Sequence, residues 1–218
     1  MFKRPGLLAI TLALVLLATG ACGGKSSPGE LTYEAPFTTG VTAGNFLPGT
    51  DLQYRGITDG MAEVYIKGQR ALKQKADSLS WEGQVREGVS LDLGLRVLWF
   101  DESTLHVGGT AKVKVTGASV QAATPPERAA LMFGNAPVAY TVKRGEAIPG
   151  TLLTYKGRTG EGAELGGTGD YPYRRAGDSI VWAGVIKENV WLQVNLRVGV
   201  YTDQTLAVAG LASFWIEP

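Results

Sequence analysis

An all-β fold, made of two tandem copies of one small antiparallel unit, is what the sequence predicts. Sliding the 218-residue chain by 101 positions aligns residues 36–117 with residues 137–218 without a gap, and 28 of the 82 pairs are identical. Within each copy, apolar residues recur at every second position, which is typical of strands with one buried face. Turn sequences containing Gly and Pro separate these runs. The single cysteine excludes a disulfide framework, so the fold must rest on its core.

The first 21 residues indicate an export signal. Lys3 and Arg4 precede an apolar stretch over residues 7–18, and Thr19-Gly20-Ala21-Cys22 follows at once. A membrane-spanning helix is excluded by length, because twelve residues rise about 18 Å against a hydrocarbon core of about 30 Å. We therefore expect residues 1–21 to be a signal peptide.

Small residues leading into a single cysteine resemble the lipobox of bacterial lipoproteins. The resemblance implies that the Cys22 sulfur receives a diacylglycerol, that the chain is cleaved before Cys22, and that the new amino terminus is acylated. Several hydrocarbon chains give stable membrane attachment. The protein would then be exported and anchored to the outer membrane or to the outer face of the cell membrane, with residues 22–35 as lipidated cysteine and flexible tether. Ordinary cleavage after Ala21 is the alternative.

The first repeat, residues 36–117, shows about six strands. They are expected at 37–43, 52–58, 62–66, 79–85, 89–97 and 104–115, with counterparts 101 residues later. The last two are joined by a short polar turn and should form an antiparallel hairpin. Pro48-Gly49-Thr50 and its counterpart Pro149-Gly150-Thr151 supply the backbone angles of a turn before a strand.

A linker with a short helix is expected over residues 118–136. Thr124, Pro125, Pro126 and Glu127 have the form of a capping box with prolines in the first turn, and Gly134 could end the helix. The second repeat, residues 137–218, follows. Short strands with regular turns predict two small barrels or sandwiches, and the alternative is one larger barrel of about twelve strands.

Charge excludes one class of partner. Residues 36–117 carry nine basic and nine acidic side chains, and residues 137–218 carry eight of each. A nucleic-acid-binding protein needs a basic surface to neutralise phosphates, so no nucleic-acid partner is expected. The same balance argues against electrostatic attraction to anionic lipids, so membrane attachment would depend on the acyl chains.

Residues retained in both copies are interpreted as structural. An inward tryptophan, a strand arginine and an aspartate before a strand recur as Trp81 and Trp182, Arg96 and Arg197, and Asp77 and Asp178. Alternation assigns the tryptophans to the core, and the aspartates are expected to cap turns. The arginines indicate cross-strand ion pairs, with a functional anion contact as the alternative.

Catalytic constellations are scarce. The only histidine, His106, becomes Ala207 in the second copy, so neither a histidine-dependent triad nor a metal site with several histidines can form. We expect no cofactor, no metal and no catalytic residues. Two other functions stay open: a carboxylate-dependent hydrolase of envelope polysaccharide, and a carrier of an apolar ligand. Small inward residues would leave space inside a barrel for that ligand, namely Gly109, Ala111, Gly210 and Ala212.

Function is expected where the copies differ most, at residues 65–76 against 166–177. Aromatic and guanidinium groups of the second copy could form a surface for a glycan or a protein partner: Tyr171, Tyr173, Arg174, Arg175 and Trp191. A solvent-facing hairpin is the simpler reading. The sequence therefore predicts a lipid-anchored cell-envelope protein that serves as a non-enzymatic binding or structural module.

Overall fold

The computed structural model describes residues 29–169 and 171–218, and all regular structure within them is β-strand. The first repeat contains β1 (Glu30–Thr42), β2 (Leu52–Thr58), β3 (Met61–Ile66), β4 (Gln69–Lys73), β5 (Ser78–Arg86), β6 (Val89–Phe100) and β7 (Thr104–Thr116). Next come β8 (Gln121–Ala122), β9 (Leu131–Lys143), β10 (Thr154–Arg158), β11 (Ala163–Gly166), β12 (Tyr173–Arg174), β13 (Ser179–Lys187), β14 (Val190–Tyr201) and β15 (Thr205–Ile216). The predicted all-β class is confirmed. The predicted signal peptide and Cys22 lie outside the described residues.

Each repeat builds one large antiparallel sheet. The strand order is β1-β7-β6-β5 in the first and β8-β13-β14-β15-β9 in the second. The alternation predicted over residues 89–97 is present, because Val89, Leu91 and Leu93 are buried while Ser90 and Asp92 are exposed. The predicted hairpins form between β6 and β7 and between β14 and β15.

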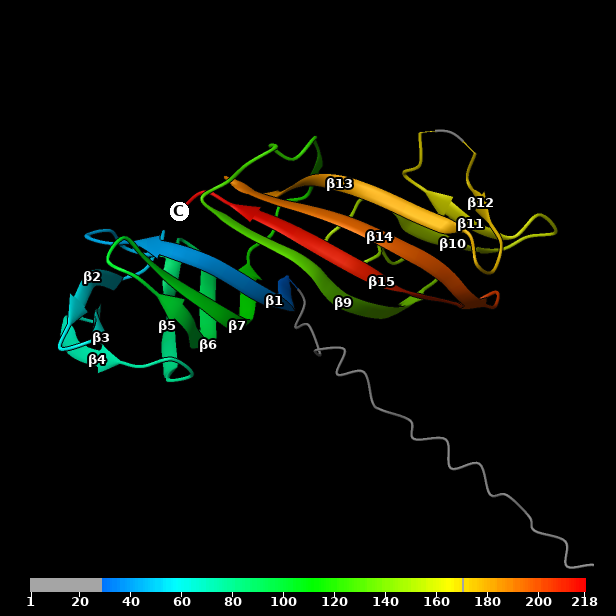
Figure 1. Cartoon of the computed structure of the whole chain (residues 1–218). Helices are drawn as coiled ribbons and strands as arrows, with labels where there is room; N and C mark the ends of the chain where they lie inside the picture. The colour runs from blue at the N-terminus through cyan, green and yellow to red at the C-terminus, as the bar shows by residue number, and fades with distance from the viewer. Residues whose placement is uncertain (1–28, 170) are drawn as a thin grey trace, which may run out of the picture.

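Each repeat also builds a small three-stranded sheet, β2-β3-β4 or β10-β11-β12. The two small sheets lie at opposite ends of the molecule (Figure 1). A tyrosine on each ties the small sheet to the turn of the neighbouring hairpin, since Tyr54 Oη donates a hydrogen bond to the Asp101 carbonyl at 2.5 Å, and Tyr155 Oη donates to the Thr202 carbonyl. Burial raises the pKa of both phenols above their usual value.

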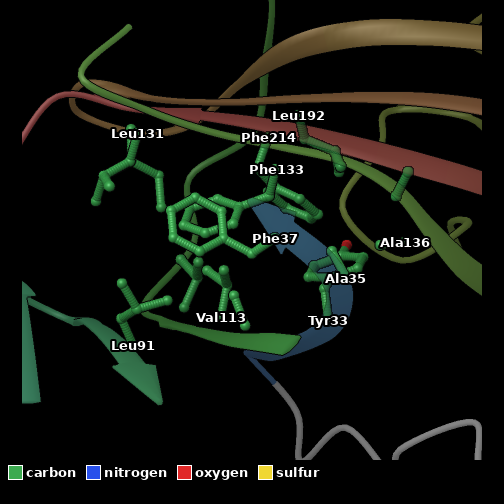
Figure 2. Packing of buried hydrophobic residues seen from close by; sticks show 14 of the residues in the cluster. Tyr33, Ala35, Phe37, Leu91, Val113, Leu131, Phe133, Ala136, Leu192 and Phe214 are labelled. Carbon is green, nitrogen blue, oxygen red and sulfur yellow. The ribbon is translucent and has the colours of Figure 1, made fainter. Parts of the chain in front are cut away.

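The two large sheets pack against one another (Figure 2). Tyr33 and Phe214 have ring centroids 4.2 Å apart, and Phe37 and Phe133 have centroids 4.9 Å apart. Buried residues of both repeats form one continuous hydrophobic core. Of the predicted barrels or sandwiches, the closed barrels are wrong, both as two small ones and as a single larger one: the sheets stay open and share a core. A unit of about 80 residues buries little apolar surface alone, so each repeat gains stability by covering the other.

The predicted helical linker is also wrong, because the described residues contain no helix. Residues 121–122 form β8, and β9 already begins at Leu131. Leu131 and Phe133 are both buried, and an irregular step at Asn135, which has φ 59°, lets Ala136 face the core next. A helix of two or three turns is marginal by itself, so the capping residues are outweighed by the burial of two large apolar side chains.

Part of the segment predicted as a tether, residues 22–35, belongs to a strand instead. β1 begins at Glu30 rather than near residue 37, and Leu31, Tyr33 and Ala35 alternate into the core. Thirteen residues of β1 pair without a shift with β7. The Gly, Ser and Pro content of the segment favours a tether. Pro36 nevertheless lies within β1, an edge strand, where a missing N–H is tolerated.

Candidate functional site

A groove lies under the segment that joins the repeats, residues 123–130, here called the strap. Before it, β8 pairs with β13 at one edge of the five-stranded sheet, and after it β9 pairs with β15 at the other edge. The strap must therefore cross the whole sheet. Its two ends are held by hydrogen bonds, from Ala123 N to the Ala183 carbonyl at 3.4 Å and from Ala130 N to Glu217 Oε1 at 3.1 Å.

A groove of about 650 Å³ lies between the strap and the outer face of the sheet. Its lining comes from the strap side and from three strands: Ala122, Ala123, Thr124, Pro125, Pro126, Ala183, Gln193 and Trp215. The sheet residues among them face outward, because their neighbours Trp182, Leu192 and Phe214 are buried in the core. Space remains beneath the strap because two consecutive prolines lack N–H groups and cannot pair with a strand.

Trp215 supplies the aromatic ring in the lining of this groove. Trp215 lies in register with Trp191 on one side and with Met132 on the other, so an apolar row crosses the sheet. The indole nitrogen of Trp215 is buried and has no hydrogen-bond partner. It is therefore the ring face of Trp215, and not its buried nitrogen, that the groove can offer to a ligand.

The groove has no ionisable side chain in its lining. It offers one amide, one hydroxyl, backbone groups and an indole ring. This set can hold a neutral polar ligand by stacking and hydrogen bonding.

The same place in the first repeat has a different character. The positions equivalent to Ala183, Gln193 and Trp215 are Glu82, Asp92 and Lys114. Lys114 makes an ion pair with Glu30, with Nζ 2.9 Å from Oε2. The groove is therefore a feature of the second repeat and not of the duplicated fold.

The predicted aromatic and guanidinium surface is brought together in part. Tyr171 and Tyr173 form an edge-to-face pair with centroids 5.4 Å apart, and Arg174 Nη1 donates to the carbonyls of both, at 2.5 and 2.9 Å. Arg175 points elsewhere, its Nε donating to the Glu161 carbonyl at 3.4 Å. Trp191 belongs to the five-stranded sheet, where its register partners are Val185 and Trp215.

The structure places the retained tryptophans and aspartates where alternation and turn chemistry put them. Trp81 and Trp182 are buried. The Asp77 carboxylate accepts a hydrogen bond from Gln74 N at 2.8 Å, and the Asp178 carboxylate accepts one from Arg175 N at 2.7 Å. Both aspartates thus close the turn that precedes β5 or β13.

The retained arginines make hydrogen bonds rather than ion pairs within the described residues. Arg96 Nη1 donates to the Ala76 carbonyl at 2.9 Å, and Arg197 Nη1 donates to the Ser179 hydroxyl. Glu63, an acid that recurs as Glu164 in the second repeat, makes its ion pair with Arg70. The cross-strand ion pair expected for these arginines is corrected accordingly, because their nearest acceptors lie in the turn before β5 and at the start of β13.

Sequence reasoning misses Trp215 and Gln193. Alternation already points Trp215 outward, between the inward Phe214 and Ile216, and this large apolar residue on a polar face is the signal that could have found it. The strap itself has no sequence signal, since its position depends on which sheet edge β9 joins.

The glycines expected to leave interior space, Gly109 and Gly210, are instead packed against by the backbone of the neighbouring strand. A Cβ atom on Gly109 or Gly210 would lie 2.1 Å from the carbonyl oxygen of Gly94 or Asn195. Glycine at these positions allows neighbouring strands to approach closely. Ala111 and Ala212 are fully buried in the core.

Over the described residues, no group of three or more potential metal ligands occurs. The same residues contain no helix of the length and hydrophobicity that membrane crossing needs. No protein-family model matches the chain, and neither the curated proteins nor the solved structures contain a match to it.

Proposed function

We propose that this chain is an exported, lipid-anchored protein of the bacterial cell envelope, acting as a non-enzymatic binding module that holds a neutral saccharide in the groove under the strap. The observation that carries this proposal is the groove itself, about 650 Å³ with Trp215 and Gln193 in its lining and no charged side chain there. Sugar rings present apolar C–H faces that stack on indole and hydroxyls that pair with amides.

The two alternatives have less support. A hydrolase of envelope polysaccharide needs two carboxyl groups about 5 to 10 Å apart beside the ligand, and the groove lining contains none. A carrier needs interior space, whereas the glycines expected to provide it accommodate strand backbones at Gly94 and Asn195. A neutral ligand on the outer face fits these observations better.

The anchor would hold the start of β1, an edge strand of the four-stranded sheet, close to the membrane. Cys22 precedes the first residue of β1, Glu30, by eight positions. Because one residue spans at most about 3.6 Å, the lipidated sulfur would lie within about 30 Å of the start of the sheet. A module held this near the membrane is suited to a ligand of the envelope rather than to a distant soluble one.

Calorimetric titration with neutral oligosaccharides tests the binding site. We expect one of a set of N-acetylglucosamine, glucan and mannan pentamers to bind, and Gln193→Ala to weaken it about fivefold through loss of one hydrogen bond. Asp92→Ala, at the equivalent position of the first repeat, is the matched control and should leave binding unchanged. Absence of binding for all pentamers would remove the support for this site.

Lipidation is tested separately by the intact mass of protein purified from membranes. The expected mature chain begins at Cys22 and carries a diacylglycerol and an amide-linked acyl group. A chain beginning at Gly23, or an unmodified Cys22 thiol, would contradict the anchor while leaving the groove hypothesis to its own test.

A further inference from the structure

The outer face of the first repeat carries an aromatic pair, Trp99 and His106, that the proposed function does not use. The pairing of β6 with β7 shifts between Val97 and Trp99, so that Leu98 and Trp99 both reach solvent. Trp99 is 49% exposed and Leu98 is 41% exposed. Large apolar side chains exposed side by side on a sheet mark a binding surface more often than scattered single ones.

His106 holds Trp99 in a fixed orientation. The two rings are stacked, with centroids 3.8 Å apart and an interplanar angle of 13°. On its other side, His106 lies opposite Gly40 of β1. An aromatic ring that is held in place loses little conformational entropy when a ligand stacks on it.

Arg96 is the outward residue that precedes Leu98 on β6, and it has unused donors. Its register partner Gly108 lies under the Leu98 side chain, so Arg96 and Leu98 share the same part of the surface. Arg96 makes one hydrogen bond, to the Ala76 carbonyl, and no ion pair within the described part of the chain. A guanidinium group has five N–H donors in a planar fork that matches a carboxylate.

The second repeat keeps the arginine and lacks the aromatic pair. Arg197 is retained, but Val200 and Ala207 replace Trp99 and His106. Arg197 also donates to the Ser179 hydroxyl of its neighbouring strand. The arginine therefore belongs to the duplicated fold, whereas the aromatic pair was added or kept in one copy alone. The two copies supply a matched comparison within one molecule.

We propose that Arg96, Leu98, Trp99 and His106 form a second site, independent of the strap groove, that binds an acidic glycan. The apolar face of one uronic acid ring stacks on Trp99, and the carboxylate of a neighbouring ring along the glycan accepts hydrogen bonds from Arg96. Stacking on the indole ring contributes affinity for the sugar. The charge-assisted hydrogen bonds distinguish an acidic sugar from a neutral one.

The only histidine of the chain provides a local probe. In the full-length protein, the imidazole resonances of His106 are followed by NMR during titration with hexagalacturonate and with the carboxyl-reduced, neutral hexamer. We expect saturable shifts with hexagalacturonate and at least about tenfold weaker binding of the neutral hexamer. No shift with either hexamer, or equal affinity for both, would overturn the proposal.

Substitutions separate the site from the fold. Arg96→Gln is expected to weaken hexagalacturonate binding about tenfold, while Arg197→Gln leaves it unchanged. Trp99→Ala should abolish the binding, and Trp99→Phe should keep most of it because an aromatic face remains. Circular dichroism confirms that each variant is folded. Equal losses in Arg96→Gln and Arg197→Gln, or full binding by Trp99→Ala, would overturn the proposal.

Discussion

The indole nitrogen of Trp81 donates a hydrogen bond to the Asp51 carboxylate at 2.5 Å. The bond ties the turn at residues 48–50 to the inner face of β5. The second repeat retains the tryptophan as Trp182 but has Leu152 in place of the aspartate. One structural tryptophan is thus held by packing and a hydrogen bond, and its counterpart lacks the carboxylate partner.

Replacing Asp51 with the residue of the second repeat should destabilise the protein. Asp51→Leu removes the acceptor, and we expect the free energy of unfolding to fall by about 1 to 2 kcal/mol. Asp51→Asn keeps an acceptor oxygen and should cost less. Urea denaturation followed by tryptophan fluorescence measures both variants, and equal losses would contradict a role for the hydrogen bond.

The motif Trp-x-Gly, present in both copies, predicts a steric requirement. A Cβ atom on Gly83 would lie 2.7 Å from the indole ring of Trp81. Gly83→Ala must therefore displace the ring or the strand, and we expect a loss of about 1 to 3 kcal/mol. Gly134→Ala is the control, because a Cβ there meets no atom within 4 Å. Similar thermal unfolding temperatures for the two variants would refute this explanation of the glycine.

Two substitutions separate the contribution of apolar packing between the repeats from that of a polar group buried in the same interface. Phe37 lies against Phe133 across the two sheets, so Phe37→Ala should cost about 3 to 5 kcal/mol. The Tyr33 hydroxyl is buried and makes no hydrogen bond of good geometry, and burial together with the neighbouring Tyr140 hydroxyl raises its pKa, so Tyr33→Phe should be neutral or stabilising. Chemical denaturation of both variants tests this ordering. A large loss for Tyr33→Phe would show that its hydroxyl has a partner.

Glu63 should make stability depend on pH. Arg70 Nε donates to its carboxylate at 2.7 Å and Thr58 Oγ1 at 2.6 Å, and these bonds lower its pKa from the ordinary 4.5 to about 2. A lowered folded-state pKa stabilises the fold above pH 4.5, and this contribution is lost as the pH falls from about 4.5 towards 2. Glu63→Gln should therefore be less stable than the unmodified protein at pH 7, with the difference shrinking at pH 3.

A matched variant and a direct titration accompany that experiment. Glu164→Gln changes the equivalent position of the second repeat, where Tyr171 replaces Arg70, and it should show a smaller effect. The side-chain carboxyl resonance of Glu63, followed by NMR, should titrate near pH 2. A difference between Glu63→Gln and the unmodified protein that grows on acidification would contradict the assigned direction.

Much of the fold could be predicted because its signals are local or periodic. Alternation identified the strands around Leu91 and Leu192 and the inward direction of Trp81, since side chains of a strand point to opposite faces in turn. Turn chemistry identified the role of Asp77, because its carboxylate bonds to a backbone N–H three residues away. The duplication allowed each of these inferences to be checked against the second copy.

The errors came from contacts between distant segments. The capping residues around Thr124 favour a helix locally, but Leu131 and Phe133 are buried in a strand that pairs with β15. The segment before Pro36 has the composition of a tether, yet Leu31 and Tyr33 belong to the core. In both places tertiary burial outweighed a weak local preference.

By itself, the sequence determined the duplication, the all-β class, the inward tryptophans and the turns, because each depends on neighbours within a few residues or on a simple period. Only the tertiary structure decided that the two repeats share one core, that the strap crosses the outer face of the five-stranded sheet above Trp215, and that Trp99 stacks on His106. These arrangements depend on which strand edges pair and which apolar faces meet. Such pairings join residues far apart in the chain, and no local pattern records them.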